Sequence, residues 1–213
     1  RAGVSRRALL VVQNPEESRD LARSARSRSR TVLVAGAGVD CTAFRPTPEP
    51  PPPVTVVLPG RMLTSKGVPE FAEAARRLLA RGVRARFLLA GDADPGNPSA
   101  VDPDTIRAWE RAGVVRWLGQ HHDMPALLAA SHVVCLPSHG EGLPKALTEA
   151  AAAGRPIVAT DVAGCRDVVR AGVNGLLVPP RDPAALAAAL GALIGDAALR
   201  ERFGHAGRAI ALE

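Results

Sequence analysis

The chain of 213 residues is 46% hydrophobic and 23% charged, a globular composition with enough apolar sequence for one good core or two small ones. No apolar run approaches the roughly 18–20 residues of a membrane-spanning helix, which excludes such a segment from these residues. The three cysteines, Cys41, Cys135 and Cys165, are far apart and lack metal-ligand spacing, which is typical of a reducing compartment.

The net charge of +6 is concentrated near the start of the chain. Residues 1–46 contain nine Arg against four acidic residues, and the remaining residues are nearly balanced. The densest part, ARSARSRSR at residues 22–30, lacks the interleaved aromatic residues of a nucleic-acid-binding surface, so we expect no nucleic-acid partner. A solvated face and a surface that meets anionic lipid both stay open. We therefore expect a cytoplasmic protein that can lie at the inner face of a membrane.

The first part of the chain has the pattern of one βαβ unit. Residues 8–12 and 31–35 are predicted to be short buried strands, with a polar helix at about 15–26 between them. The following segment at 46–53, PTPEPPPP, cannot continue a helix or a sheet and is predicted to be a semi-rigid linker. The predicted organisation is an N-terminal part over residues 1–46, a Pro-rich linker over 47–53 and a second domain over 54–213.

From residue 54 onward, strand-like and helix-like segments alternate regularly. The predicted strands are 54–58, 85–90, 114–117, 132–136, 156–160 and 175–178. The predicted helices are 68–81, 103–112, 124–130, 144–153, 163–170, 182–194 and 197–211. Such alternation predicts an α/β fold with a Rossmann-like, doubly wound parallel sheet. Ligands of these sheets bind beyond the carboxyl ends of the strands, at the topological switch point.

The loop after the first of these strands, GRMLTSKG at residues 60–67, offers two cations. Arg61 provides a planar fork that suits phosphate, whereas Lys66 provides a point charge. Alone, this spacing fits solvated charges near a helix start equally well. Two later loops are less specific: GDADPGNP at 91–98 has the composition of a turn. In LGQHHD at 118–123, adjacent histidines without a nearby cysteine do not make a metal site.

The stretch PSHGEGLPKALTEAAAAG at residues 137–154 has the pattern strand, glycine loop, helix N-terminus. Gly140 and Gly142 let the backbone approach a ligand closely, and the first amides of the following helix favour an anion. Glu141 and Glu149 would be repelled by a phosphate, so both are better placed to accept hydrogen bonds from sugar or ribose hydroxyls. The alternative for Glu149 is a solvated surface pair with Lys145.

These two glutamates, with GLP after the first and small residues around the second, resemble the E-x7-E motif of retaining glycosyltransferases of family 4. That family has the GT-B fold, and this chain would be its C-terminal half. The resemblance implies that Glu141 binds the transferred sugar and that Glu149 accepts both ribose hydroxyls. It also implies that Arg61 and Lys66, in a segment similar to G-R-x4-K-G, hold the donor diphosphate. The backbone contacts implied for the donor are those of Gly60, Gly119, His121, Gly140, Gly142 and Leu143.

The resemblance extends over nearly the whole chain. VVQN, GAGVD and Phe44 are similar to the end of the family's N-terminal domain and its GVD-x3-F connector. Because Arg1 has no preceding Met and most of that domain is missing, we expect a fragment whose acceptor half is largely absent. The DPGNP loop is similar to that of enzymes acting on lipid-linked sugars in bacterial surface polysaccharide synthesis. TDVAGC at 160–165 departs from the family's T-x-x-G-G-x segment, so only a packing role is predicted there.

The function implied is transfer of a sugar from a UDP- or GDP-sugar to a hydroxyl acceptor, with the anomeric configuration kept. No metal or cofactor is expected, because Arg61, Lys66 and helix-terminal amides can offset the charge on the departing diphosphate. An epimerase or dehydrogenase would need G-x-G-x-x-G, which GAGVD and GRMLTSKG both lack. A non-catalytic nucleotide-sugar binding module stays open, because this fragment is expected to bind its donor without efficient transfer.

Overall fold

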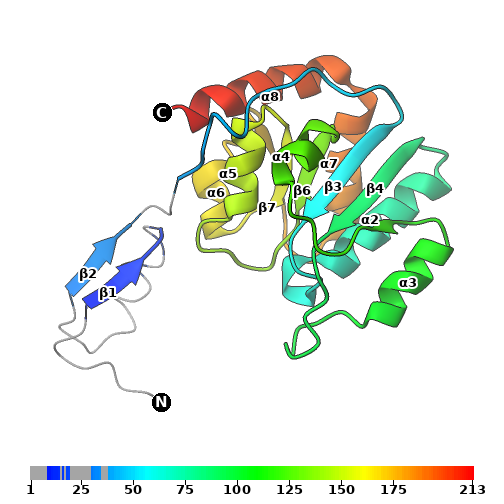
Figure 1. The fold of residues 1–213 in the computed structure, drawn as a ribbon, viewed down its shortest axis with the longest axis horizontal. Coiled ribbons are helices and arrows are strands. Elements are labelled where there is room, and N and C mark those ends of the chain that lie inside the picture. Colours follow the sequence, from blue (N-terminus) through cyan, green and yellow to red (C-terminus); the bar gives the residue numbers. More distant parts are fainter. Residues whose placement is uncertain (1–8, 15, 17, 20–29, 35–37) are drawn as a thin grey trace.

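The computed structural model describes residues 9–14, 16, 18, 19, 30–34 and 38–213 (Figure 1). They form a two-stranded sheet and a six-stranded sheet, joined by an extended segment. The six strands are β3 (Val54–Pro59), β4 (Ala85–Ala90), β5 (Arg116–Trp117), β6 (Val133–Leu136), β7 (Ile157–Thr160) and β8 (Gly175–Val178). Their order is β5-β4-β3-β6-β7-β8, and every pairing is parallel.

Helices cover both faces of this sheet, as the predicted doubly wound fold requires. Within β3, Val56 and Leu58 face one core and Val57 faces the other, because successive side chains of a strand point to opposite faces. The first core contains residues of α2 (Val68–Ala80), α3 (Pro103–Arg111) and α7 (Pro183–Gly195). The second contains residues of α4 (Met124–Ala129), α5 (Lys145–Ala152) and α6 (Ala163–Val168). The predicted α/β architecture is confirmed.

The starts of four helices follow directly from the sequence. Asp102, Asp123, Asp182 and Asp196 accept hydrogen bonds from the first amides of α3, α4, α7 and α8 (Ala197–Ala211). A proline follows within two residues of the first three caps. Aspartate accepts well at an N-cap and proline lacks the amide that the first turn leaves unpaired, so these pairs mark helix starts.

Two predicted elements of the larger unit extend two residues beyond the observed ones. Residues 114 and 115 lie outside β5, because the Val114 amide bonds to the Trp109 carbonyl and closes the turn after α3. The helix predicted to reach residue 170 ends at Val168. There the Asn174 side chain donates to the Val168 carbonyl (3.0 Å) and accepts from the Arg170 amide (2.7 Å), which replaces the next helical turn.

The smaller sheet pairs β1 (Leu9–Val12) with β2 (Arg30–Leu33) in parallel, with Leu9 opposite Arg30. Both predicted strands are therefore present, within two residues of their expected ends. The expectation that they are buried is wrong, because Leu9, Val11, Val32 and Leu33 are 42–62% exposed. The helix predicted at about 15–26 and the arginine-rich segment at 22–30 lie almost wholly outside the described residues. The proposed division of the chain at residues 47–53 stays a prediction.

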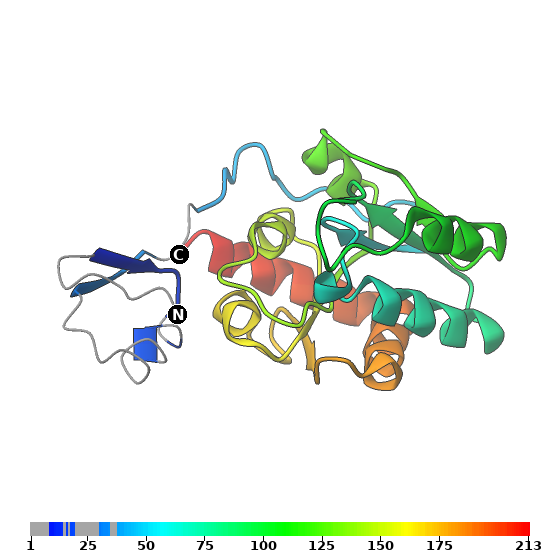
Figure 2. The same cartoon turned by 90° about the horizontal axis from the view of Figure 1, so that it is seen from below.

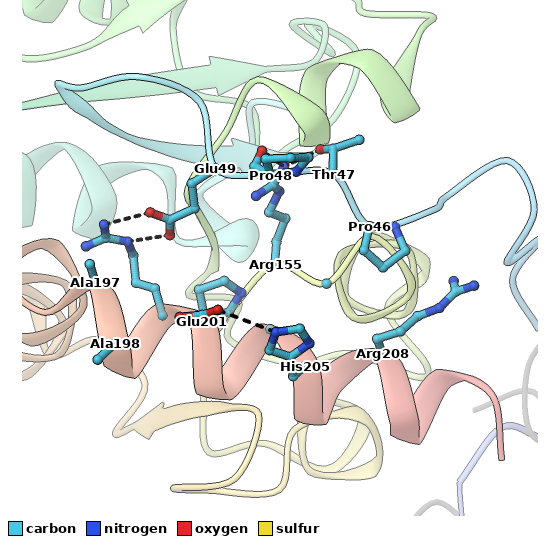
Figure 3. A pocket seen from close by; sticks show the side chains of 14 residues that line it. Pro46, Thr47, Pro48, Glu49, Arg155, Ala197, Ala198, Glu201, His205 and Arg208 are labelled. Carbon is cyan, nitrogen blue, oxygen red and sulfur yellow. Dashed lines mark hydrogen bonds and ion pairs between the residues drawn. The ribbon is translucent and has the colours of Figure 1, made fainter.

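Three arginines fasten the segment before β3 to the larger unit (Figure 3). Arg155 donates to Thr47 Oγ1 (2.6 Å), and Arg200 forms a bidentate pair with Glu49 at 2.7 and 2.9 Å. Arg208 donates to the carbonyls of Cys41 and Phe44. The proline-rich segment is thus held by side chains of the unit that follows it.

Each of these arginines also bonds to a carbonyl at the end of a helix. Arg155 bonds to Ala129 of α4, Arg200 to Ile194 of α7, and Arg208 to Ala152 of α5. A positive charge is stabilising there, because the last carbonyls of a helix carry partial negative charge. The arginines therefore complete three helix ends while they hold the linker.

The described residues contain no single helix that is both long and apolar enough to cross a membrane. Only α7 and α8 taken together meet the length and composition criteria, and they are bent by 100° at their junction. Figure 2 shows α7 beside α2, and Figure 1 shows α8 along the upper edge of the larger unit, next to α5.

Candidate functional site

The site lies where the chain changes direction in the sheet. Strands β3 and β6 are neighbours, and the chain continues from β3 to β4 on one side and from β6 to β7 on the other. Loops after two such strands diverge and leave a crevice at the carboxyl end of the sheet. The predicted loops at 60–67 and 137–143 follow these two strands, so the structure brings them together.

Backbone contacts fix the two loops against each other. The His139 amide donates to the Ser65 carbonyl at 2.8 Å. Gly67 has φ of 72°, and a Cβ there would lie 2.0 Å from the Pro137 carbonyl oxygen. Only glycine combines this left-handed backbone with so close an approach. The position of one loop therefore determines the position of the other.

Lys66 and Glu141 meet across this junction. Lys66 ends the 3-10 helix η1 (Thr64–Lys66), and its Nζ lies 2.6 Å from Glu141 Oε1. The side chain of Glu141 is 9% exposed and that of Lys66 is 26% exposed. Both charged groups are largely withdrawn from water. A ligand can replace either partner of the pair, an anion by binding the Lys66 ammonium and a hydroxyl by donating to the Glu141 carboxylate.

Glu149 is buried within α5 and not on its surface. Its Oε1 lies 3.3 Å from Lys145 Nζ, yet the Glu149 side chain is only 7% exposed whereas that of Lys145 is 77% exposed. Burial raises the pKa of the Glu149 carboxyl, and the Lys145 ammonium partly opposes the rise. The alternative of a solvated surface pair is wrong, because one partner of the pair is buried.

The glycine loop presents several unused amides. Among the described residues, the backbone amides of Gly140, Gly142 and Leu143 donate no hydrogen bond. Helix α5 likewise has no side-chain cap at its N-terminus. Unpaired amides at the start of a helix are an anion-binding feature, because they supply donors and partial positive charge together.

Arg61 stands apart from Lys66 and pairs with a residue that the sequence did not single out. Its Nη1 lies 2.7 Å from Asp94 Oδ2, and the Arg61 side chain is 59% exposed. Asp94 belongs to the loop at 91–98, whose composition predicts a turn and in which no candidate site residue was named. Both cations of the 60–67 loop are therefore ion-paired to carboxylates, each from a different loop.

The remaining predicted residues lie along adjoining strand ends. The Gly60 amide donates to the Ala90 carbonyl at 2.9 Å, and the Gly91 amide donates to the Gly119 carbonyl at 2.8 Å. A Cβ on Gly91 would lie 1.9 Å from the Gly60 carbonyl oxygen, so the loops after β3 and β4 touch through their backbones. His121 follows Gly119 and is half-buried.

One further contact at the site could not be found from the motifs. His139 Nε2 lies 2.8 Å from Glu70 Oε1 in the first turn of α2, which adds a side-chain link between the two loops. The second carboxyl oxygen of Glu70 and the Ser138 hydroxyl are buried without a hydrogen-bond partner in the described structure. No spacing rule joins residues that lie 69 positions apart.

Gly164 has the packing role that was predicted for its loop. A Cβ there would lie 2.1 Å from the Gly142 carbonyl oxygen and 2.6 Å from that of Glu141. The start of α6 therefore packs directly on the backbone of the glycine loop. Nearby, burial foremost and the Glu141 charge next raise the pKa of the Cys165 thiol to about 12.

A pocket of about 660 Å³ lies elsewhere, between the linker and α8 (Figure 3). Its lining includes Glu49, Arg155, Arg200 and Arg208, whose contacts hold the linker in place. The charged groups that meet at the switch point are absent from this lining, so we place the candidate site at the switch point. The described residues contain no group of three or more His, Cys, Asp or Glu arranged to hold a metal ion.

Residues 53–196 match the profile of a family described as glycosyl transferases group 1. This chain belongs to that family. The matched residues include the loops at 60–67 and 137–143, so the candidate site lies within the glycosyl transferases group 1 domain.

Two curated relatives are similar over about 70% of the chain. Alpha-D-kanosaminyltransferase of Streptomyces kanamyceticus is 33% identical over 148 residues, which are 70% of this chain and 38% of that enzyme. The N,N'-diacetylbacillosaminyl-diphospho-undecaprenol alpha-1,3-N-acetylgalactosaminyltransferase of Campylobacter jejuni is 33% identical over 145 residues, 68% of this chain and 36% of that enzyme. The chain thus spans less than two fifths of the length of either relative.

The fold of this group 1 chain is that of GT-B glycosyltransferases. Anabaena HepE, solved in complex with UDP and glucose, superposes with a TM-score of 0.79 at 24% identity. The superposition covers 95% of this chain and 58% of HepE. The predicted C-terminal half of a GT-B fold is confirmed at the level of architecture.

Proposed function

We propose that this chain is the donor-binding part of a retaining glycosyltransferase of family 4 that takes a sugar from a nucleotide-diphosphate donor. The observation that carries the proposal is the junction of Lys66, Glu141 and the unpaired amides of Gly142 and Leu143 at the switch point. A sugar diphosphate needs cations and amides for its phosphates and carboxylates for its hydroxyls, and this junction offers both kinds of group. The UDP and glucose bound by HepE, which has the same fold, support a nucleotide-sugar donor.

In the proposed reaction, the bond between the anomeric carbon and the diphosphate oxygen breaks. An acceptor hydroxyl oxygen forms the new bond on the same face, and its proton passes to the departing diphosphate. Arg61, Lys66 and the amides at the start of α5 stabilise the charge that develops on the leaving group. The reaction as proposed uses no metal and no general base from this chain.

The name of one relative and one loop of this chain bear on the acceptor. The Campylobacter relative is named for a diphospho-undecaprenol acceptor, and the DPGNP loop is similar to that of enzymes acting on lipid-linked sugars. We infer a lipid-linked or hydroxyl acceptor in bacterial glycan synthesis, met at the cytoplasmic face of a membrane.

A second candidate is a nucleotide-sugar binding module without turnover. The short span of this chain relative to its relatives favours that behaviour for these residues alone. We expect donor binding without efficient transfer. A turnover in the range of ordinary enzymes, about 1 to 1000 per second, would contradict it.

Three ligands and three variants test the proposed site. The ligands are a nucleoside monophosphate, a diphosphate and the diphosphate sugar. Glu149→Ala should weaken the binding of all three by about 1.5–3 kcal/mol, the value of a hydrogen bond to a charged group. Lys66→Ala should weaken the diphosphate and the diphosphate sugar and leave the monophosphate nearly unchanged. Glu141→Ala should weaken only the diphosphate sugar.

Calorimetric titration with uridine, guanosine and adenosine ligands gives these affinities and identifies the base. Glu213, which pairs with Arg170 at the surface, provides a matched control. It lies outside the site, so Glu213→Ala should leave the affinity for every ligand unchanged. Unchanged binding of all three ligands by Glu149→Ala would remove the main support for the ribose assignment.

A further inference from the structure

Asn14 reaches the glycine loop from the smaller sheet. It follows β1, whose C-terminal end is directed toward the larger unit in Figure 1, and it is only 1% exposed. Its Nδ2 donates to the Gly142 carbonyl oxygen at 3.1 Å. A carbonyl accepts and cannot donate, so the amide nitrogen must be the atom that faces Gly142.

The same carbonyl is confined from a second side. Gly164 of α6 lies so close that a Cβ there would be 2.1 Å from the Gly142 oxygen. The oxygen therefore lies between the Asn14 amide and the Gly164 backbone. One neighbour attracts it and the other limits its movement, which fixes the orientation of the peptide that joins Gly142 to Leu143.

That orientation determines where the next amide points. A trans peptide is planar, and its carbonyl and its N–H point in opposite directions. With the Gly142 carbonyl held toward Asn14, the Leu143 N–H is directed away from the smaller sheet. This N–H donates no hydrogen bond among the described residues, and Leu143 directly precedes Pro144, the N-cap residue of α5.

We propose that Asn14 is a positioning residue for the donor: its hydrogen bond to Gly142 aims the Leu143 amide at the donor diphosphate. The inference rests on the proposed function for the identity of the ligand. It adds that a residue before the proline-rich linker helps to complete the donor site. A hydrogen bond at a carbonyl also polarises the peptide and makes its N–H a stronger donor.

A neighbouring contact separates this role from general docking of the two units. Glu16 pairs with Arg166 of α6, and both side chains are partly exposed. This pair joins the same two parts of the chain without touching the Gly142 carbonyl. Glu16→Gln is therefore a matched control that weakens docking and leaves the peptide of Gly142 and Leu143 as it is.

The first test needs no ligand. In ¹⁵N-labelled protein, Asn14→Ala and the isosteric Asn14→Asp should shift the Leu143 amide resonance more than the amides of α7, because the peptide loses its carbonyl hydrogen bond. Glu16→Gln should leave that resonance in place. A Leu143 resonance unmoved in both Asn14 variants would overturn the inference, whatever the protein binds.

The second test measures affinity for UDP and UMP, or for GDP and GMP if the wild type prefers guanine. Because one hydrogen bond is lost, Asn14→Ala should lower the affinity for the diphosphate about 3- to 10-fold and change the affinity for the monophosphate by less than about 2-fold. Asn14→Asp should weaken the diphosphate further, because its carboxylate repels the carbonyl. Thermal unfolding of each variant verifies that the fold is intact.

Equal losses for the diphosphate and the monophosphate would mean that Asn14 is merely structural. The same selective loss in Glu16→Gln would assign the effect to docking, and either result overturns the inference. If the wild type binds no nucleoside diphosphate, the proposed function is refuted, and so is the diphosphate as the ligand of the Leu143 amide. In that case the Leu143 resonance would still report whether Asn14 holds the peptide.

Discussion

Glu149 carries a carboxyl group in surroundings that oppose its charge. It is buried in α5, and that burial raises its pKa above the ordinary value of 4.5. The chain could avoid the cost with a glutamine or an apolar residue of similar size. A buried carboxylate kept at this cost, in a helix that begins at the glycine loop, is consistent with a group that must accept two hydroxyl hydrogen bonds.

The raised pKa gives the stability a definite dependence on pH. The protonated carboxyl contributes stability that is fully present below the unfolded value of 4.5 and is lost as pH rises through the folded pKa. Glu149→Gln should therefore raise the unfolding temperature at pH 7 and differ little from the wild type at pH 4. The same variant should bind nucleotides less tightly.

Thermal melts at the two pH values, with a nucleotide titration at pH 7, check this expectation. Glu201→Gln is the control, because its side chain is 74% exposed and it should show neither effect. If Glu149→Gln is less stable than the wild type at pH 7, the attraction of Lys145 for the ionised carboxylate outweighs the cost of burying it, and the expectation is wrong.

The family resemblance pointed to Lys66, Glu141 and Glu149 as candidate residues, because each occupies a fixed position in a motif, whereas spacing alone left solvated charges open. Neither could identify their partners. Asp94 and Glu70 have the ordinary sequence context of a turn and of a first helical turn, and Asn14 lies 128 positions from Gly142. These contacts depend on how strands cross over in the sheet, and no local pattern contains that information.

At the scale of elements, the site depends on close approach between loops. Gly67 and Gly82 both have left-handed φ, at 72° and 79°, but only Gly67 has a neighbour within 4 Å of an added Cβ. Gly82→Ala should lower the free energy of unfolding by about 1–2 kcal/mol, because of the backbone conformation alone. Gly67→Ala should cost about 2–5 kcal/mol, because the Cβ also meets the Pro137 carbonyl.

Denaturant unfolding of the two variants measures the difference directly. Nucleotide affinity gives a second readout, because displacement of Pro137 moves the loop that carries Glu141. Gly82→Ala should bind nucleotides as the wild type does. Equal costs in the two variants would mean that the loops can separate without strain.

The order of elements was predictable because strands and helices alternate with clear punctuation. The starts of α3 and α7 coincide with Asp-Pro pairs at 102–103 and 182–183, whereas element ends were less certain. The early end of α6 depends on the Asn174 side chain, which competes with the next helical turn for the Arg170 amide. Nothing in the sequence of α6 itself announces that competition.

At the scale of the molecule, the linker behaves as part of the unit that follows it. Arg200 is 7% exposed and is neutralised by Glu49, which is 33% exposed. Glu49→Ala would leave the guanidinium without its carboxylate. The expected cost is about 1–3 kcal/mol, below the 3–5 kcal/mol of a fully buried pair because Glu49 is partly hydrated.

Chemical denaturation checks this value, with Glu213→Ala as the control. Glu213 pairs with Arg170 at the surface, so its loss should move the midpoint little. The Arg200 hydrogen bond lowers the pKa of Glu49, so its contribution is present above pH 4.5 and is lost as pH falls through the folded pKa. Equal midpoints for the two variants would show that the proline segment is not held by Glu49.

The pairing of Arg61 with Asp94 and of Lys66 with Glu141 leaves the site close to electrically neutral. An incoming anion therefore competes with these carboxylates for the two cations, and a carboxylate that loses its cation needs a new donor. Inorganic pyrophosphate brings negative charge and no hydroxyls, so it would leave Glu141 unsatisfied, whereas a sugar diphosphate replaces both partners at once. Selection against the phosphates that are abundant in a cell would then follow from this exchange of partners, without any steric barrier at the entrance.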